Sequence, residues 1–131
     1  MNKQEAFDEM VKHAAQMTCR SSLGGECLYV NEKDGNRCLV GIFLSEEDAR
    51  SCNPMGVWSS VLYGHNNLRG TNIPAWMTHP AMVMFLDAAQ RVHDRLYDYP
   101  GPFANSLLLA LEYFARSEGL YFNDPRSANS A

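Results

Sequence analysis

Cysteine and histidine are the residues of this chain best suited to catalysis, and there are four of each. Cys38, His93 and Asp94 form the most enzyme-like combination, because a thiolate beside an imidazole and a polar third member is the arrangement of cysteine hydrolases. The surrounding pattern places Cys38 in a strand, and not at a helix N-terminus, where the helix dipole would favour the thiolate. His93 can also be read as a half-buried histidine that fixes helix packing. These three residues are therefore catalytic candidates, and no firm catalytic residue is predicted.

The cysteine spacing bears on metal binding. Cys19, Cys27, Cys38 and Cys52 are separated by 8, 11 and 14 residues and contain no close C-x2-C pair. Structural zinc sites usually use such pairs, because one tight turn then directs two thiolates at the metal. Cys27 and Cys38 could still face each other across a hairpin, so whether they are free thiols or ligands stays open. The leading expectation is free, buried thiols with no metal and no cofactor.

Phosphate-loop, dinucleotide and serine-hydrolase motifs are absent from the sequence. The net charge is −4, and the 11 basic residues are scattered along the chain. Non-specific nucleic-acid binding requires clustered Lys and Arg against phosphates. We therefore expect no direct nucleic-acid partner.

The block from Cys27 to Gly41 reads as a β-hairpin. Asp34-Gly35 is the strongest short-range hairpin pattern, and it lies between two β-rich runs. Two registers are open, which pair Tyr29 with Val40 or with Cys38. Because side chains alternate along a strand, both registers place the same residues on one face. That face would carry Cys27, Tyr29, Cys38 and Val40.

Helical periodicity accounts for most of the remaining chain. We expect helices over 2–17, over 45–53, over 78–98 and in a last segment that ends at Gly119. The run VWSSVLY between Gly56 and Gly64 fits either a strand or two helical turns. The predicted fold is a single α+β domain over 1–122 with a flexible tail over 123–131. In that fold an N-terminal helix precedes the hairpin, and a mainly helical C-terminal half packs on the hairpin.

The middle of the chain carries the candidate binding residues Trp58, Tyr63, Trp76 and Met77. Exposed aromatic and methionine side chains are typical of protein-binding surfaces, although such residues also build cores. We expect these four residues to bind a partner protein, and self-association through the same patch is also expected.

Nothing in the sequence indicates a membrane segment. The longest apolar run, Leu107 to Leu111, is far shorter than the roughly eighteen residues that a membrane helix needs. The charged N-terminus has no apolar stretch typical of a signal peptide. A cytoplasmic protein is expected.

Several short motifs together resemble a family of small uncharacterised proteins of tailed bacteriophages and prophages. They are C-x-Y at Cys27 and Tyr29, D-G-x2-C-x2-G from Asp34 to Gly41, F-L-x3-Q-x2-H-D from Phe85 to Asp94, and a closing helix with Gly119-Leu120. The chain departs from that family in a longer, more aromatic 53–78 segment, and Ser45 stands where a proline often follows the second strand. The resemblance implies a phage protein acting in a bacterial host cell, with no agreed activity.

The leading functional hypothesis is a non-enzymatic, phage-encoded accessory protein that binds and modulates a host protein or defence complex. The alternative is a small cysteine/histidine enzyme or metal-binding protein that uses Cys38, His93 and Asp94. A structural component of a larger assembly is a third interpretation. An exposed aromatic patch would favour the first, and a cleft joining the hairpin to the Gln90–His93 face would favour the second.

Overall fold

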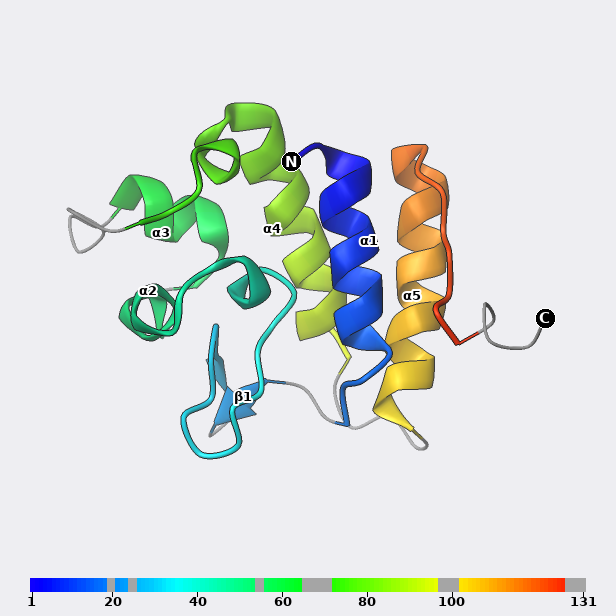
Figure 1. Ribbon diagram of the computed structural model, residues 1–131, viewed down its shortest axis with the longest axis horizontal. Coiled ribbons are helices and arrows are strands. Elements are labelled where there is room, and N and C mark those ends of the chain that lie inside the picture. The colour runs from blue at the N-terminus through cyan, green and yellow to red at the C-terminus, as the bar shows by residue number, and fades with distance from the viewer. Residues whose placement is uncertain (19–20, 24–25, 54–55, 65–71, 97–101, 127–131) are drawn as a thin grey trace.

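Five α-helices dominate the computed structural model, which describes residues 1–18, 21–23, 26–53, 56–64, 72–96 and 102–126 (Figure 1). Residues 127–131 of the expected tail, Cys19 and the side chain of Cys27 lie outside the described part. The helices are α1 (Lys3–Ala14), α2 (Glu46–Cys52), α3 (Trp58–Gly64), α4 (Pro80–Asp94) and α5 (Phe103–Glu118). Two 3-10 helices, η1 (Gly41–Phe43) and η3 (Ala75–Thr78), and two strands, β1 (Ser22–Leu23) and β2 (Glu26–Cys27), complete the described elements.

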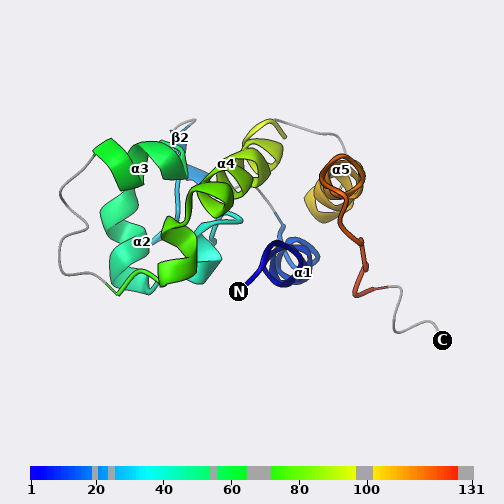
Figure 2. The same cartoon turned by 90° about the horizontal axis from the view of Figure 1, so that it is seen from above.

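The three longest helices, α1, α4 and α5, run alongside one another (Figures 1 and 2). Phe7 of α1, Phe114 of α5 and Phe85 of α4 meet between them, with ring-centroid distances of 6.2 Å for Phe7–Phe114 and 5.7 Å for Phe85–Phe114. Tilted aromatic pairs at this spacing add to the stabilisation from buried apolar area. These aromatic contacts join the three helices around one core.

Local capping fixes where several helices begin and end. Asn2 and Glu5 form a reciprocal capping box at the start of α1. Gly119 adopts φ +70° after α5, and the Leu120 N–H donates to the Ala115 carbonyl as in a Schellman motif. Ser45 caps α2 by accepting the N–H of Asp48 at 3.1 Å. These ends agree with the sequence-based helices.

The predicted α+β fold with a 27–41 hairpin is wrong, because the described chain is helical. β1 and β2 form a ladder of two residue pairs, and between residues 28 and 41 the only bridge joins Val30 and Arg37. The Asn53 side chain takes a donor that a second strand would need: its Oδ1 accepts the Tyr29 N–H at 2.6 Å, and its Nδ2 also donates to the neighbouring Val30 carbonyl at 2.6 Å. The chain after Cys38 then turns into η1, so the ladder does not extend.

The C-terminal helices therefore do not pack on a hairpin: α5 packs on α1 and α4 instead. The ambiguous VWSSVLY run is the helix α3, which packs with η3 against α4 (Figure 2). In the described part of the chain, no helix combines the length and apolar character needed to cross a bilayer.

Candidate functional site

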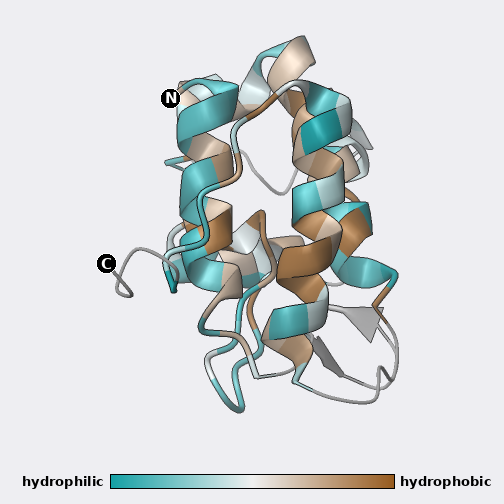
Figure 3. Cartoon of the chain, turned by 90° about the vertical axis from the view of Figure 1, so that its right-hand side faces the viewer, coloured by the Kyte–Doolittle hydropathy of each residue, from teal (hydrophilic) through white to brown (hydrophobic). Residues whose placement is uncertain are grey.

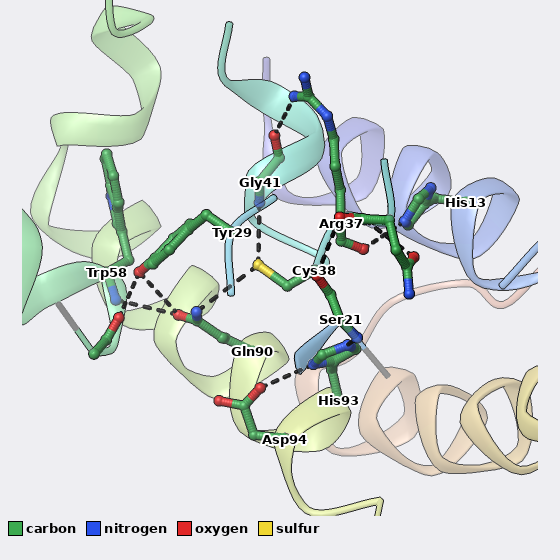
Figure 4. Close-up of polar contacts among 12 residues, drawn as sticks. His13, Ser21, Tyr29, Arg37, Cys38, Gly41, Trp58, Gln90, His93 and Asp94 are labelled. Carbon is green, nitrogen blue, oxygen red and sulfur yellow. Dashed lines mark hydrogen bonds and ion pairs between the residues drawn. The ribbon is translucent and has the colours of Figure 1, made fainter. Parts of the chain in front are cut away.

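A buried polar cluster centres on the carboxamide of Gln90 in α4 (Figure 4). Gln90 Oε1 accepts the backbone N–H of Trp58 at 3.2 Å and lies 3.5 Å from the hydroxyl of Tyr29. Gln90 Nε2 donates to Cys38 Sγ at 3.9 Å. The Tyr29 hydroxyl has a closer acceptor, the Gly56 carbonyl, at 2.7 Å. Burial raises the pKa of Tyr29 far above its usual value, so this hydroxyl stays neutral and acts as a donor.

The same face of α4 holds the N-terminus of α3. Asp87 Oδ1 accepts the N–H of Ser59 at 2.8 Å, next to the bond from Trp58 to Gln90. The first N–H groups of a helix have no partner within the helix, so these two side chains satisfy donors that burial would leave unpaired. This role of Asp87 was not predicted from the sequence; its three-residue spacing from Gln90, which places both side chains on one helix face, is the signal that would have indicated it.

His93 is fully buried, and its two ring nitrogens have different partners. Nε2 lies 3.2 Å from the backbone N–H of Ser21 and must accept from it, because a backbone N–H cannot accept. Nδ1 lies 2.8 Å from Asp94 Oδ1 and therefore carries the proton. The Ser21 N–H thus occupies the lone pair that a general base would need.

Cys38 is fully buried as well, and Gly41 donates its backbone N–H to the sulfur at 3.3 Å. Figure 4 shows the sulfur directed toward Gly41 and Gln90, whereas the ring of His93 lies between Ser21 and Asp94. The structure therefore places Cys38, His93 and Asp94 in one region without pairing the thiol with the imidazole. Structurally, the C-x2-G motif is a sulfur-capped turn.

Cys52, the other cysteine whose side chain the structure describes, is also not placed for catalysis or metal binding. Cys52 is a buried free thiol, and burial together with the nearby Asp48 charge raises its pKa to about 12. Among the residues that the structure describes, no group of three His, Cys, Asp or Glu side chains is placed to hold a metal ion.

The four predicted partner-binding residues do not form one patch. Trp58 and Met77 are fully buried, and the Trp58 indole N–H donates to the Met77 carbonyl at 2.8 Å. Tyr63 is 68% exposed on α3. Trp76 is half-buried, with its ring edge-on to Phe43 at a centroid distance of 4.9 Å. Of the four, only Tyr63 and Trp76 reach the surface.

Phe43, which Trp76 contacts, lines a surface hollow that the sequence did not indicate. The hollow lies between α1 and η1, has a volume of about 450 Å³, and is lined by Met1, Glu9, Lys12, His13, Gln16, Ile42 and Phe43. A second hollow of about 260 Å³ adjoins it on the far side of His13 and Gln16 and extends to Asp34, Gly35 and Asn36. We call the first hollow the α1–η1 groove. Its volume is within the range of small-molecule and peptide pockets.

His13 forms the boundary between the two hollows and ties α1 to the loop before η1. Its Nε2 lies 2.7 Å from the carbonyl of Arg37, and burial is the main cause that lowers the pKa of this imidazole. Arg37 in turn donates from Nη1 to the carbonyls of Gly41 and Leu44 at 2.9 and 2.7 Å. Hydrogen bonds made by His13 and Arg37 therefore hold in place the wall of the groove opposite α1.

Comparison of the chain with protein-family models, curated proteins and solved structures gives no match. The resemblance to phage proteins therefore stays a prediction.

Proposed function

We propose that this chain is a non-enzymatic binding protein that recognises a partner protein through the α1–η1 groove. Following the phage resemblance, the partner would be a host protein or defence complex in the bacterial cytoplasm. The proposed binding surface therefore differs from the one predicted from the sequence. Trp76 lies at the edge of the α1–η1 groove, whereas the buried Trp58 and Met77 have no direct contact role.

One observation carries the proposal. Cys38 and His93 are buried and have structural partners, whereas the polar side chains of the α1–η1 groove line an open hollow. His93 and Cys38 each accept a backbone N–H, so the lone pair of each is used within the fold and neither side chain faces the α1–η1 groove. This arrangement favours recognition over catalysis.

The groove has two chemically different walls. Ile42 and Phe43 are half-buried on the η1 side, and Trp76 extends this apolar surface. On α1, Lys12 and Glu9 form an exposed ion pair at 3.3 Å. Apolar anchors beside solvated charges are the usual composition of a transient protein interface. A partner segment with an apolar side chain flanked by charged groups fits both walls.

The test is a tagged pull-down from bacterial lysate, read by mass spectrometry, with the full chain and three variants. Lys12→Glu reverses a charge of the α1 wall, and Phe43→Ser removes the apolar wall. Tyr63→Ser is the matched control, because it removes an exposed aromatic outside the groove. Circular dichroism checks that each variant is folded.

The expected result is a stoichiometric partner that wild type and Tyr63→Ser retain and that both groove variants lose. A partner that depends on Tyr63 and ignores both groove variants would reject the groove as the contact surface. Failure of folded wild type to retain any stoichiometric partner would contradict the proposal as a whole.

A further inference from the structure

The chain after Gly119 forms a strap, Leu120–Arg126, that crosses from the end of α5 toward α1 and runs along it (Figure 3). From Leu120 to Asp124 its residues alternate in exposure: Leu120, Phe122 and Asp124 are partly buried, and Tyr121 and Asn123 are exposed. Period-two alternation is the pattern of an extended segment with one face on a surface. The helices α1 and α5 thus already bind an extended peptide, supplied by the chain itself.

Gln4 of α1 recognises the backbone of this segment. Its Oε1 accepts the N–H of Tyr121 at 2.9 Å, and its Nε2 donates to the carbonyl of the same residue at 3.0 Å. The Gln4 amide is oriented by a further bond from Nε2 to Asp8 Oδ1 at 2.8 Å. Paired bonds to the N–H and the carbonyl of one residue imitate strand pairing and do not depend on the side chain bound.

Phe122 provides the side-chain recognition. It is half-buried, and its ring centroid lies 6.5 Å from that of the fully buried Phe7. Phe7 also contacts Phe114 of α5, so an aromatic side chain at this position reaches the contact between the two helices. With Leu120 two residues earlier, the segment presents an aliphatic-x-aromatic pattern to the surface between α1 and α5.

The strap is held by contacts that a competitor could replace. The two bonds to Gln4 are exposed to solvent, so bonds to water or to a competing peptide can replace them. At its far end, Arg126 bonds to Asp124 and to Asn105 in the first turn of α5, also at the surface. Gly119, in the left-handed conformation, stands between α5 and the strap. Release of the strap from this point would uncover the surface around Phe7 without breaking a helix.

We infer that the surface between α1 and α5 is a second binding site, for an extended segment of a partner protein with an aliphatic-x-aromatic pattern, and that Leu120–Arg126 occupies this site until such a segment displaces it. The inference does not depend on the α1–η1 groove, which uses another part of α1.

Binding of a labelled peptide with the sequence of Gly119–Arg126, GLYFNDPR, to the full chain tests this site by fluorescence anisotropy. Phe122→Ala weakens the attached strap and leaves the surface around Phe7 intact. Tyr121→Ala is the matched control, because Tyr121 is 79% exposed and faces away from the site. A peptide with alanine in place of the phenylalanine controls for recognition of the aromatic ring.

The Phe122→Ala chain is expected to bind the peptide about tenfold or more tightly than wild type and Tyr121→Ala, because a closed strap lowers the fraction of competent sites. Adding Gln4→Ala to Phe122→Ala is expected to remove binding, and the alanine peptide is expected not to bind. Absence of binding to folded Phe122→Ala, or equal binding of both peptides, would overturn the inference. A wild-type dimer that the free peptide dissociates would make a second copy the occupant and would reject a foreign partner. A failed pull-down through Lys12 or Phe43 would leave this result unaffected.

Discussion

His93 Nε2 accepts the backbone N–H of Ser21 at 3.2 Å, and this contact ties α4 to a segment 72 residues earlier in the chain. The bond fixes the imidazole in its Nδ1–H form, with that proton directed at Asp94. The histidine of the H-D motif therefore has a structural role that its sequence context does not reveal.

Replacing His93 tests this role. His93→Phe keeps an aromatic ring but leaves the Ser21 N–H unpaired, so the free energy of unfolding should fall by about 1–3 kcal/mol. Urea denaturation measures the change, and His79→Phe is the control because His79 is exposed. Nitrogen-15 chemical shifts should show the Nδ1–H tautomer in wild type. Observation of the Nε2–H tautomer would contradict the assignment.

The N-terminus of α3 should depend on Asp87. Asp87→Leu removes the acceptor of the Ser59 N–H and should lower the free energy of unfolding by about 1–2 kcal/mol. Asp87→Asn keeps an oxygen in the same place and should cost clearly less. Faster hydrogen exchange of the Ser59 amide in Asp87→Leu alone would identify the lost cap. Equal stability of both variants would show that no cap is lost.

The close approach of the backbone at η1 can be tested by substituting Gly41, with Gly64 at the end of α3 as the matched control. A Cβ on Gly41 would lie 2.0 Å from the Tyr29 carbonyl oxygen, whereas a Cβ on Gly64 would have no neighbour within 4 Å. Gly41→Ala should therefore destabilise the fold by about 3 kcal/mol or more, because the obstacle is backbone. Gly64→Ala should be neutral or stabilising by up to about 1 kcal/mol. Thermal unfolding of both variants compares them, and similar melting temperatures would argue against this close approach.

His13 should make stability depend on pH. Burial lowers its pKa in the folded state below the ordinary value of 6.5, so the unfolded chain binds the proton more readily. The contribution of His13 is therefore fully present above pH 6.5 and is lost as the pH falls through and below that value. The groups around it are Glu9 and Lys12 on α1, Asp34 and Arg37 on the facing loop, and His93 on α4.

His13→Gln keeps a side-chain donor for the Arg37 carbonyl and removes the titration. Between pH 7.5 and pH 5, wild type should lose more stability than His13→Gln in urea denaturation. Parallel profiles for the two proteins would show that His13 has the same pKa in both states.

The Cys52 thiol should react slowly in the folded protein. With its pKa raised from 9.0 to about 12, the thiolate fraction at pH 8 falls by about a thousandfold, and burial adds a steric barrier. Alkylation with iodoacetamide followed by site-resolved mass spectrometry measures the rate, with the urea-unfolded chain as reference. A folded-state rate close to the unfolded rate would contradict this prediction.

Local patterns predicted the parts of the fold that depend on neighbouring residues. Asn2, Ser45 and Gly119 mark helix ends because caps and left-handed turns act within a few residues. The hairpin prediction failed because its outcome depended on Asn53, whose amide takes the hydrogen bonds of Tyr29 and Val30 from 23 or more residues away. Strand propensity gives no information on such a distant competitor.

For the candidate sites, the sequence by itself determined which side chains are present and their order along the helices. It drew attention to Cys38, Gln90 and His93, and the structure brings all three to the same buried region. Only the tertiary structure decided that the lone pair of His93 is used by Ser21, that Trp58 lies in the core, and that His13 stands between two hollows. The physical reason is that exposure and proton position depend on contacts between segments far apart in the chain, whereas caps and helical periodicity depend on near neighbours.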